Sequence, residues 1–284
     1  MAAASMSKPF LRWAGSKTAL APEILPLLGF DDRGTYHEPF LGSGAVFFAI
    51  APSKAVLSDM NADLVCAFLA LRDYPKVLFE RLHEHERRHL EFGDGYYYTV
   101  RSLKSATIDR VWTEENLLHF GSRFLYLNRA GFNGLWRVNK KGEMNTPIGK
   151  DRNKRCIVKF NTPLLTGCSE LLQNADIRHC SYERSLDNVK EGDRVYCDPP
   201  YVPIDQATNF SAYASDFPMD LQLDLLHRCK DLGIDGATVV LSNSFSPVTE
   251  ALYIGCTRKT VQINRSIAAN RADRKVVREF LISF

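Results

Sequence analysis

The chain lacks the cysteine pattern of a disulfide framework or a zinc site. Its seven cysteines are odd in number and widely spaced, and no two of them form a C-x-x-C pair. Disulfide frameworks and zinc sites use paired, closely spaced cysteines, so this spacing predicts reduced thiols in a cytoplasmic protein. We therefore expect neither a disulfide nor a structural zinc ion.

Long apolar runs, internal repeats and low-complexity segments are missing too. No apolar run approaches the ~20 residues that a membrane-spanning helix requires. The N-terminus has no basic segment followed by an apolar one, so no secretory leader is expected. These absences predict a cytoplasmic protein with no membrane partner.

A strong excess of either charge is also absent. The 36 Lys and Arg residues nearly balance the 33 Asp and Glu residues, which leaves a net charge of +3. This balance permits an anionic partner such as nucleic acid but does not demand one. With 284 residues the chain can bury a large core, and one large domain that carries an insertion is expected.

The most informative motif is residues 195–201, an apolar run that ends in Asp198, Pro199, Pro200 and Tyr201. Ligands of open α/β sheets bind beyond the carboxyl ends of the strands, where this loop would lie. A carboxylate and a neighbouring carbonyl can accept both hydrogens of an exocyclic amino group while an aromatic ring stacks on its base. The motif predicts a pocket for a flipped nucleobase. The alternative is a strand-end turn with a helix-capping Asp and a packed Tyr.

A Gly-x-Gly turn followed by an acid indicates a cofactor site. Residues 36–48 are typical of a strand, the turn Gly42-Ser43-Gly44 and an apolar helix, and residues 55–59 of a strand that ends at Asp59. Such a turn brings backbone amides against a nucleotide, and the acid suits ribose hydroxyls. The third glycine of the dinucleotide fingerprint is missing. The pattern predicts an adenosine-containing cofactor and leaves a dinucleotide and S-adenosylmethionine open.

Residues 10–17 form a second candidate for cofactor contact. Small residues at positions 14–16 would let a ligand approach the backbone, and Lys17 near a helix start suits an anionic group. The alternative is an ordinary helix N-terminus with a buried Trp13.

The middle of the chain has a different character. Residues 62–90 have helical apolar spacing, and His85 and His89 could share one face of that helix. Their charged neighbours and the missing third ligand argue against a metal, so none is expected. Residues 92–159 are polar, basic and aromatic, with a helical pattern at 113–126.

Residues 135–147 are typical of a hairpin, with a turn at 140–142. Arg, Asn and Lys interleaved with aromatics on such a ribbon can reach base edges and phosphates. Residues 150–159 would extend the basic surface toward phosphates. The alternative is a basic surface hairpin with no role in binding.

An α/β pattern resumes after residue 160. Residues 202–218 form a long loop beside the Asp198 motif, which we predict to be a gate or a DNA-contacting flap. Residues 265–271 add positive charge near the C-terminus. The remaining elements are expected as helices at 164–174 and 220–232 and strands at 176–180, 194–197 and 237–242.

Assembled in this order, the chain resembles the Dam family of DNA adenine-N6 methyltransferases over residues 8–282. Residues 198–201 match the family's catalytic motif, residues 39–47 its cofactor-loop motif and residues 10–17 its N-terminal cofactor motif. Cofactor motifs first, recognition region next and catalytic motif last is the order of its alpha group, in the D12 class. The resemblance implies a doubly wound, Rossmann-like α/β sheet with an inserted, mostly helical DNA-recognition domain that carries a β-hairpin. The domain boundaries it implies are 1–62 and 161–284 for the catalytic domain and 63–160 for the recognition domain.

The resemblance also implies S-adenosylmethionine as the cofactor and no metal. Asp198 and the Pro199 carbonyl would hold the adenine amino group, and Tyr201 would stack on the flipped base. Ser16 and Arg12 stand where the family usually has glycine and lysine, and the arginine could alter discrimination at the first base pair. The implied cofactor contacts are Trp13, Gly15, Lys17, Phe40, Gly42, Ser43, Gly44, Asp59 and Asp198. The implied DNA contacts, which would read GATC, are Arg12, Tyr126, Asn128, Asn133, Leu135, Arg137 and Pro147.

The implied partner is double-stranded DNA. A restriction endonuclease acting on the same site is one candidate companion, and no stable protein partner is required. Two rival classes stay open: a dinucleotide-dependent oxidoreductase, which gives residues 198–201 no role, and a non-catalytic DNA-binding module, against which the intact motif argues. The same chemistry at another sequence, on RNA or on cytosine is a further alternative.

Overall fold

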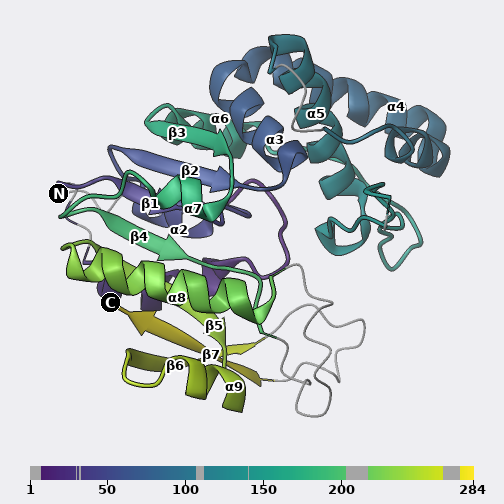
Figure 1. Cartoon of the computed structure of the whole chain (residues 1–284). Coiled ribbons are helices and arrows are strands. Elements are labelled where there is room, and N and C mark those ends of the chain that lie inside the picture. The colour runs from purple at the N-terminus through teal and green to yellow at the C-terminus, as the bar shows by residue number, and fades with distance from the viewer. Residues whose placement is uncertain are drawn as a thin grey trace. The chain divides into compact units, whose positions relative to one another are not determined.

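The computed structural model describes the chain at residues 8–29, 31, 33–106, 112–139, 141–202, 217–264 and 276–284. Figure 1 shows the chain with its elements labelled. Most of the predicted flap at 202–218 and all of the basic segment at 265–271 lie outside the described residues.

Seven strands form one mixed sheet in the order β3-β2-β1-β4-β5-β7-β6. Strand β1 pairs in parallel with β2 on one side and β4 on the other, and β4 pairs in parallel with β5. The pairs β5–β7 and β6–β7 are antiparallel. The α/β class is therefore confirmed, and the strand order reverses at β1, where ligands of such sheets bind. The strands are β1 (Tyr36–Glu38), β2 (Ala55–Asp59), β3 (Ala175–His179), β4 (Arg194–Cys197), β5 (Thr238–Ser244), β6 (Thr257–Asn264) and β7 (Val276–Ser283).

The helices follow the expected order with one correction. The single helical stretch expected at 62–90 is two helices that meet at Tyr74, because Pro75 disfavours helical geometry in the residue before it. No helix of the described residues is long and apolar enough to span a membrane. The helices are α1 (Ala21–Leu28), α2 (Ala45–Ile50), α3 (Ala62–Asp73), α4 (Pro75–Arg101), α5 (Glu114–Ala130), α6 (Thr162–Leu172), α7 (Tyr182–Leu186), α8 (Met219–Ile234) and α9 (Pro247–Leu252), with short 3-10 turns η1 (Lys17–Ala19) and η2 (Phe132–Gly134).

The chain forms two compact units, which are described separately. Unit 1 consists of residues 1–18, 42–51 and 58–181, and unit 2 of residues 19–41, 52–57 and 182–284. The expected recognition region and most of the expected cofactor residues belong to unit 1, and the Asp198 motif belongs to unit 2. The expected domain boundaries after residues 62 and 160 stay a prediction.

Unit 2 has its core between helix α8 and the sheet. Leu225 and Cys229 of α8 pack with Val195 of β4 and with Val239 and Leu241 of β5, and each of these side chains is fully buried. Figure 1 shows α8 running along these strands. Since β4 is buried, its end is fixed, and the loop that follows it starts from a rigid point.

Unit 1 has a helical core in which α3, α4 and α5 gather (Figure 1). Gly121 of α5 lies against α3, where a Cβ atom would be 2.9 Å from the carbonyl oxygen of Cys66. Only a residue without a side chain allows this approach, so the glycine sets how closely the two helices pack.

A cluster of histidines and tyrosines ties α4 to α5. The ring of His85 stacks on that of Tyr126 with centroids 4.7 Å apart, and its Nδ1 accepts a hydrogen bond from Tyr96 at 2.8 Å. His89 joins the Tyr126 hydroxyl at 2.8 Å. Both histidines therefore have protein partners, and the described residues contain no cluster of three or more potential metal ligands.

Acid is expected to destabilise unit 1 through His85. Burial, helped by the charge of Arg88, lowers the pKa of His85 to about 4. In the unfolded chain this pKa is about 6.5. Between pH 6.5 and 4 the imidazole is therefore protonated in the unfolded state but not in the folded state. The free energy of unfolding should fall across this window by up to about 3 kcal/mol. Urea unfolding at pH 7 and pH 5 measures the loss.

A matched pair of variants tests the assignment. His85→Gln should remove this part of the pH dependence, whereas His83→Gln, at an exposed position on the same helix, should keep it. Equal pH dependence in both variants would contradict the role of His85.

Candidate functional site

The Asp198 loop in unit 2 is held by side chains from two other elements. Gln222 of α8 donates from Nε2 to the Pro200 carbonyl at 2.8 Å. Asn243 of β5 accepts a hydrogen bond from the Val202 amide at 3.3 Å, and Ser244 donates to the Val202 carbonyl at 2.7 Å. The loop therefore leaves β4 in a fixed conformation.

Tyr201 is anchored through its hydroxyl. The phenol donates to Oε2 of Glu279, on strand β7, at 2.8 Å. Burial, followed by the negative charge of Asp198, raises the pKa of Tyr201 well above its ordinary value, so the phenol stays neutral. A neutral ring fixed at its far end offers a flat face that needs no reordering when a planar ligand stacks on it.

A buried polar network supports this loop, and sequence reasoning missed it. Asn243 donates from Nδ2 to Gln222 at 3.0 Å and to the Tyr253 hydroxyl at 2.8 Å. Gln222 is 1% exposed and Asn243 is fully buried. The available signal was the polar run Ser242-Asn243-Ser244 at the end of an otherwise apolar strand.

The predicted cofactor turn in unit 1 is organised around Asp59. Its Oδ2 accepts the Gly42 amide at 2.9 Å, and its Oδ1 accepts the Asn61 amide at 2.8 Å. Burial raises the pKa of Asp59, while these amide hydrogen bonds lower it. A carboxylate has about four lone-pair sites, so the group can also accept from a ligand hydroxyl.

Trp13 packs directly on this turn. Gly42 has φ +49°, and a Cβ there would lie 2.9 Å from the Trp13 ring. Both the positive φ angle and the close approach of the Trp13 ring require a glycine at position 42. Trp13 and Gly42 were both predicted from the sequence to contact a cofactor, and the structure brings them together with Asp59.

The other expected cofactor residues fall into two places. In unit 1, the buried Lys17 donates to the Gly15 carbonyl at 2.8 Å, and the Ser16 and Ser43 hydroxyls are hydrogen-bonded at 2.9 Å. In unit 2, the Phe40 ring stacks on Tyr182, with centroids 5.5 Å apart. Gly44 has φ +65° and begins helix α2.

The expected hairpin exists as an irregular ribbon in unit 1. The Asn145 amide donates to the Arg137 carbonyl at 2.9 Å, and the Phe132 amide to that of Pro147 at 2.9 Å. Only isolated bridges form between its described residues, so it has no regular strands. Arg137 Nε also donates to Asn145 Oδ1 at 2.7 Å, which orients its exposed guanidinium.

The expected DNA contacts divide into exposed and buried residues. Tyr126 is fully buried and Asn128 is 4% exposed, so neither is available to a ligand on the surface of unit 1. Their polar groups bind other parts of the protein, which makes them structural supports of the recognition region. Leu135 is half-buried. The exposed residues are Arg12, Asn133, Arg137 and Pro147.

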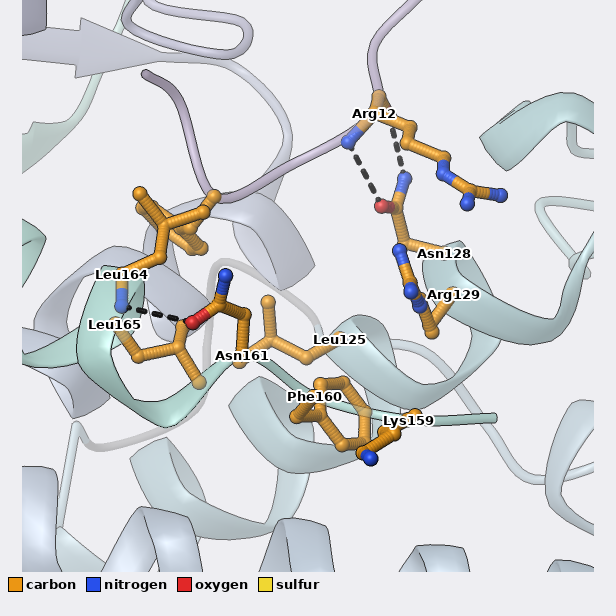
Figure 2. Close-up of a pocket in the computed structure, with 10 residues that line it drawn as sticks. Arg12, Leu125, Asn128, Arg129, Lys159, Phe160, Asn161, Leu164 and Leu165 are labelled. Atoms are coloured by element: carbon orange, nitrogen blue, oxygen red, sulfur yellow. Dashed lines mark hydrogen bonds between the residues drawn. The ribbon is translucent and has the colours of Figure 1, made fainter. Parts of the chain in front are cut away.

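A small cationic pocket adjoins Arg12. Figure 2 shows the cationic side chains of Arg12, Arg129 and Lys159 at this pocket, which encloses about 60 Å³. Burial, followed by the charge of Arg12, lowers the pKa of Arg129. Within the described residues nothing accepts a hydrogen bond from Arg129 Nε. The surface next to Arg12 therefore favours an anionic ligand.

Comparison with known proteins agrees with these features. A family model described as D12 class N6 adenine-specific DNA methyltransferase matches residues 13–267. The chain is 34% identical over 280 residues to the type II methyltransferase M1.LlaDCHI of Lactococcus lactis subsp. cremoris, covering 97% of this chain and 95% of that protein. It is 31% identical to the DNA adenine methylase of Haemophilus influenzae, over 98% of this chain and 93% of that one. The DNA adenine methylase of Escherichia coli is 30% identical, over 97% and 94% respectively.

Proposed function

Because this chain belongs to the D12 class of N6 adenine-specific DNA methyltransferases, we propose that it methylates the adenine of GATC in double-stranded DNA after flipping that base out of the helix. Transfer of a methyl group to DNA adenine is the activity of the class. The target sequence, base flipping and the role of each residue are the proposal. The observation that carries it is the loop of residues 198–201, in which hydrogen bonds hold the Tyr201 hydroxyl and the Pro200 carbonyl in place.

The loop would bind the adenine amino group through two acceptors. Asp198 accepts one N–H and the Pro199 carbonyl accepts the other, while Tyr201 stacks on the ring. The neighbouring Pro200 carbonyl already accepts from Gln222, which supports Pro199 as the acceptor. Holding both hydrogens keeps the nitrogen lone pair from delocalising into the ring and so makes the nitrogen more nucleophilic. The proton released after transfer goes to Asp198 or to water.

Two costs oppose this arrangement. Flipping a paired base out of the stack costs a few kcal/mol, which stacking on Tyr201 and contacts in the recognition region must offset. Orienting the amino group costs conformational freedom, and a loop that is already rigid reduces that cost. Catalysis then consists mainly of positioning and electrostatics.

The methyl donor of this class is S-adenosylmethionine, which supplies an electrophilic methyl group on a sulfonium centre. The donor set around Asp59 fits an adenosine-containing cofactor, because its carboxylate is preset by two amides beside a glycine where a side chain would clash. Asp59 would accept the ribose hydroxyls, and Trp13 would pack on the cofactor. Lys17 and Asp198 would neutralise its charged methionine end. The remaining contacts would come from Gly15, Phe40, Gly42, Ser43 and Gly44.

The DNA would lie against the exposed part of the recognition region. Arg12, Asn133, Leu135, Arg137 and Pro147 would contact base edges of GATC. Phosphate contacts would come from basic residues at 150–159. We further propose that the protein acts in the cytoplasm without a stable partner or a metal. The type II methyltransferase among its relatives supports a restriction endonuclease as a companion at the same site.

One assay tests this function. Labelled methyl is transferred from S-adenosylmethionine to two duplexes that differ only in whether the GATC is scrambled, and the product nucleosides are identified. N6-methyladenine in the GATC duplex alone supports the proposal. Label in both duplexes would keep the enzyme class but refute GATC, and label in neither would direct the search to RNA or to another sequence.

Removing the Arg137 side chain is expected to relax specificity. Arg137→Ala should cost about 1–3 kcal/mol in transition-state binding, and the loss should be confined to one base pair of the target. The measurement is kcat/KM on duplexes with each base pair changed in turn. A uniform loss on every duplex would instead identify Arg137 as a phosphate contact. Asn145→Ala should produce a weaker form of the same change, because it frees the guanidinium that it now orients.

A further inference from the structure

One buried side chain, Asn128, joins two segments of unit 1 that are far apart in the sequence. Asn128 of α5 accepts the Arg12 amide at 3.1 Å and donates from Nδ2 to the Arg12 carbonyl at 2.6 Å (Figure 2). Its Nδ2 also donates to the Gly134 carbonyl at 2.9 Å. Arg12 is 116 residues away along the chain, and Gly134 is six. A single carboxamide therefore fixes the backbone of Arg12 against the turn that begins the hairpin.

The two segments are also in direct contact. Gly134 has φ +66°, and a Cβ built there would lie 2.4 Å from the Cβ of Arg12. Two carbon atoms that are not bonded cannot approach so closely, so any side chain at position 134 would clash with Arg12. Glycine is therefore required at this position. Arg12 is thus held by two hydrogen bonds with Asn128 and lies in close contact with Gly134.

An asparagine side chain suits the hydrogen bonds that join Arg12 to Gly134, which we call the joint, and few other side chains could replace it. The joint needs one acceptor and two donors on a short side chain, which a carboxamide supplies. Aspartate keeps the acceptor but loses both donors. Asn128 is 4% exposed, whereas Arg12 is exposed, so the backbone of Arg12 is fixed and its guanidinium is presented to the surface.

We propose that Asn128 is a positioning residue that determines specificity at the base pair read by Arg12 without itself touching DNA. The proposal rests on the proposed function, in which Arg12 contacts the target. A bidentate arginine contact requires both N–H groups to meet their acceptors within a narrow range of distance and angle. A shift of the Arg12 backbone would spoil this contact, so the largest loss of discrimination should fall at the base pair that Arg12 reads.

The test measures discrimination rather than activity. Discrimination at a base pair is the ratio of kcat/KM for the correct duplex to kcat/KM for a duplex in which that base pair is substituted. The base pair that Arg12 reads is the one at which Arg12→Ala lowers this ratio. Asn128→Asp should lower the same ratio by about tenfold or more, and should lower it by more than the ratio at any other base pair. Because each ratio compares two substrates on one enzyme preparation, it does not depend on the fraction of protein that is folded.

A double variant, and a second single variant that also displaces Arg12, distinguish a positioning role of Asn128 from a general structural effect. In Arg12→Ala/Asn128→Asp, discrimination at that base pair should be no lower than in Arg12→Ala alone. Gly134→Ala keeps Asn128 but places a methyl group against Arg12, so it should reproduce the loss at the same base pair. Additive losses, or losses spread over all base pairs, would overturn the proposal.

The matched control is Asn161→Asp. Asn161 lines the same pocket and caps helix α6 by accepting the Leu164 amide at 3.2 Å, a role that aspartate performs equally well. The control adds the same charge to the same pocket without touching Arg12, so its ratios should match those of the unchanged enzyme. An equal loss in the control would overturn the proposal in favour of a charge effect. Failure of the proposed function itself is distinguishable, because the unchanged enzyme would then not discriminate GATC from its scrambled form.

Discussion

Asp198→Ala is expected to abolish methyl transfer while leaving binding of duplex DNA within a few-fold of normal. Asp198 begins the loop that follows β4 and would accept one of the two amino hydrogens of the target adenine. Alanine removes that acceptor and the negative charge that stabilises the developing positive charge on the nitrogen. We expect kcat to fall by about 10³-fold or more. Single-turnover methyl transfer and fluorescence anisotropy of labelled duplex measure the two quantities.

Two further variants sharpen this experiment. Asp198→Asn keeps one acceptor without the charge, so an intermediate rate would separate hydrogen bonding from electrostatics. Asp235→Ala, at an exposed position just after α8, should leave the rate unchanged. Turnover of Asp198→Ala within tenfold of normal would refute the catalytic role assigned to this residue.

Asp63→Ala is expected to destabilise unit 1 by about 3–5 kcal/mol. Asp63 of α3 forms an ion pair with Arg123 of α5, with Oδ1 and the guanidinium 3.4 Å apart and side-chain exposures of 4% and 2%. Burial raises the pKa of Asp63, and the charge of Arg123 lowers it. Removing the carboxylate leaves the guanidinium buried with no counter-charge. The midpoint of urea unfolding measures the loss.

The surroundings of Arg123 explain why the structure cannot relax around this change. Its guanidinium donates to the Leu103 carbonyl at 2.7 Å and to the Val100 carbonyl at 3.2 Å, so it is held where it is. Asp63→Ala/Arg123→Met, which replaces the pair by apolar groups, should regain most of the stability. Glu84→Ala, which breaks an exposed ion pair with Arg87, should have a much smaller effect. Equal loss in the single and double variants would contradict the argument.

The site residues that were predicted from the sequence share one property: each was recognised from residues close to it in the chain. The acid and aromatic at 198–201 follow an apolar strand, and the Gly-x-Gly turn joins a strand to a helix. The strands that precede the two motifs, β1 and β4, pair in parallel in the sheet. The break at Tyr74 was missed, although proline acts on the residue directly before it and Pro75 was the available signal.

Burial separates two of the predicted DNA contacts, Tyr126 and Asn128, from the exposed ones. Tyr126 and Asn128 lie next to the hairpin in the chain, and their polar groups made them candidates for DNA contact. In the folded chain Tyr126 binds His89, and Asn128 binds the backbone of Arg12. When both faces of a helix contain polar and aromatic residues, the sequence pattern does not predict which face is buried.

The sequence by itself determined the fold class and the family, and it predicted the acid, turn and aromatic that we propose carry the chemistry. Only the tertiary structure decided what holds them. Tyr201 is fixed by Glu279, 78 residues later, and Arg12 by Asn128, 116 residues later. Local patterns report the chemistry of neighbouring residues, whereas these hydrogen bonds join positions whose proximity depends on how every intervening element packs.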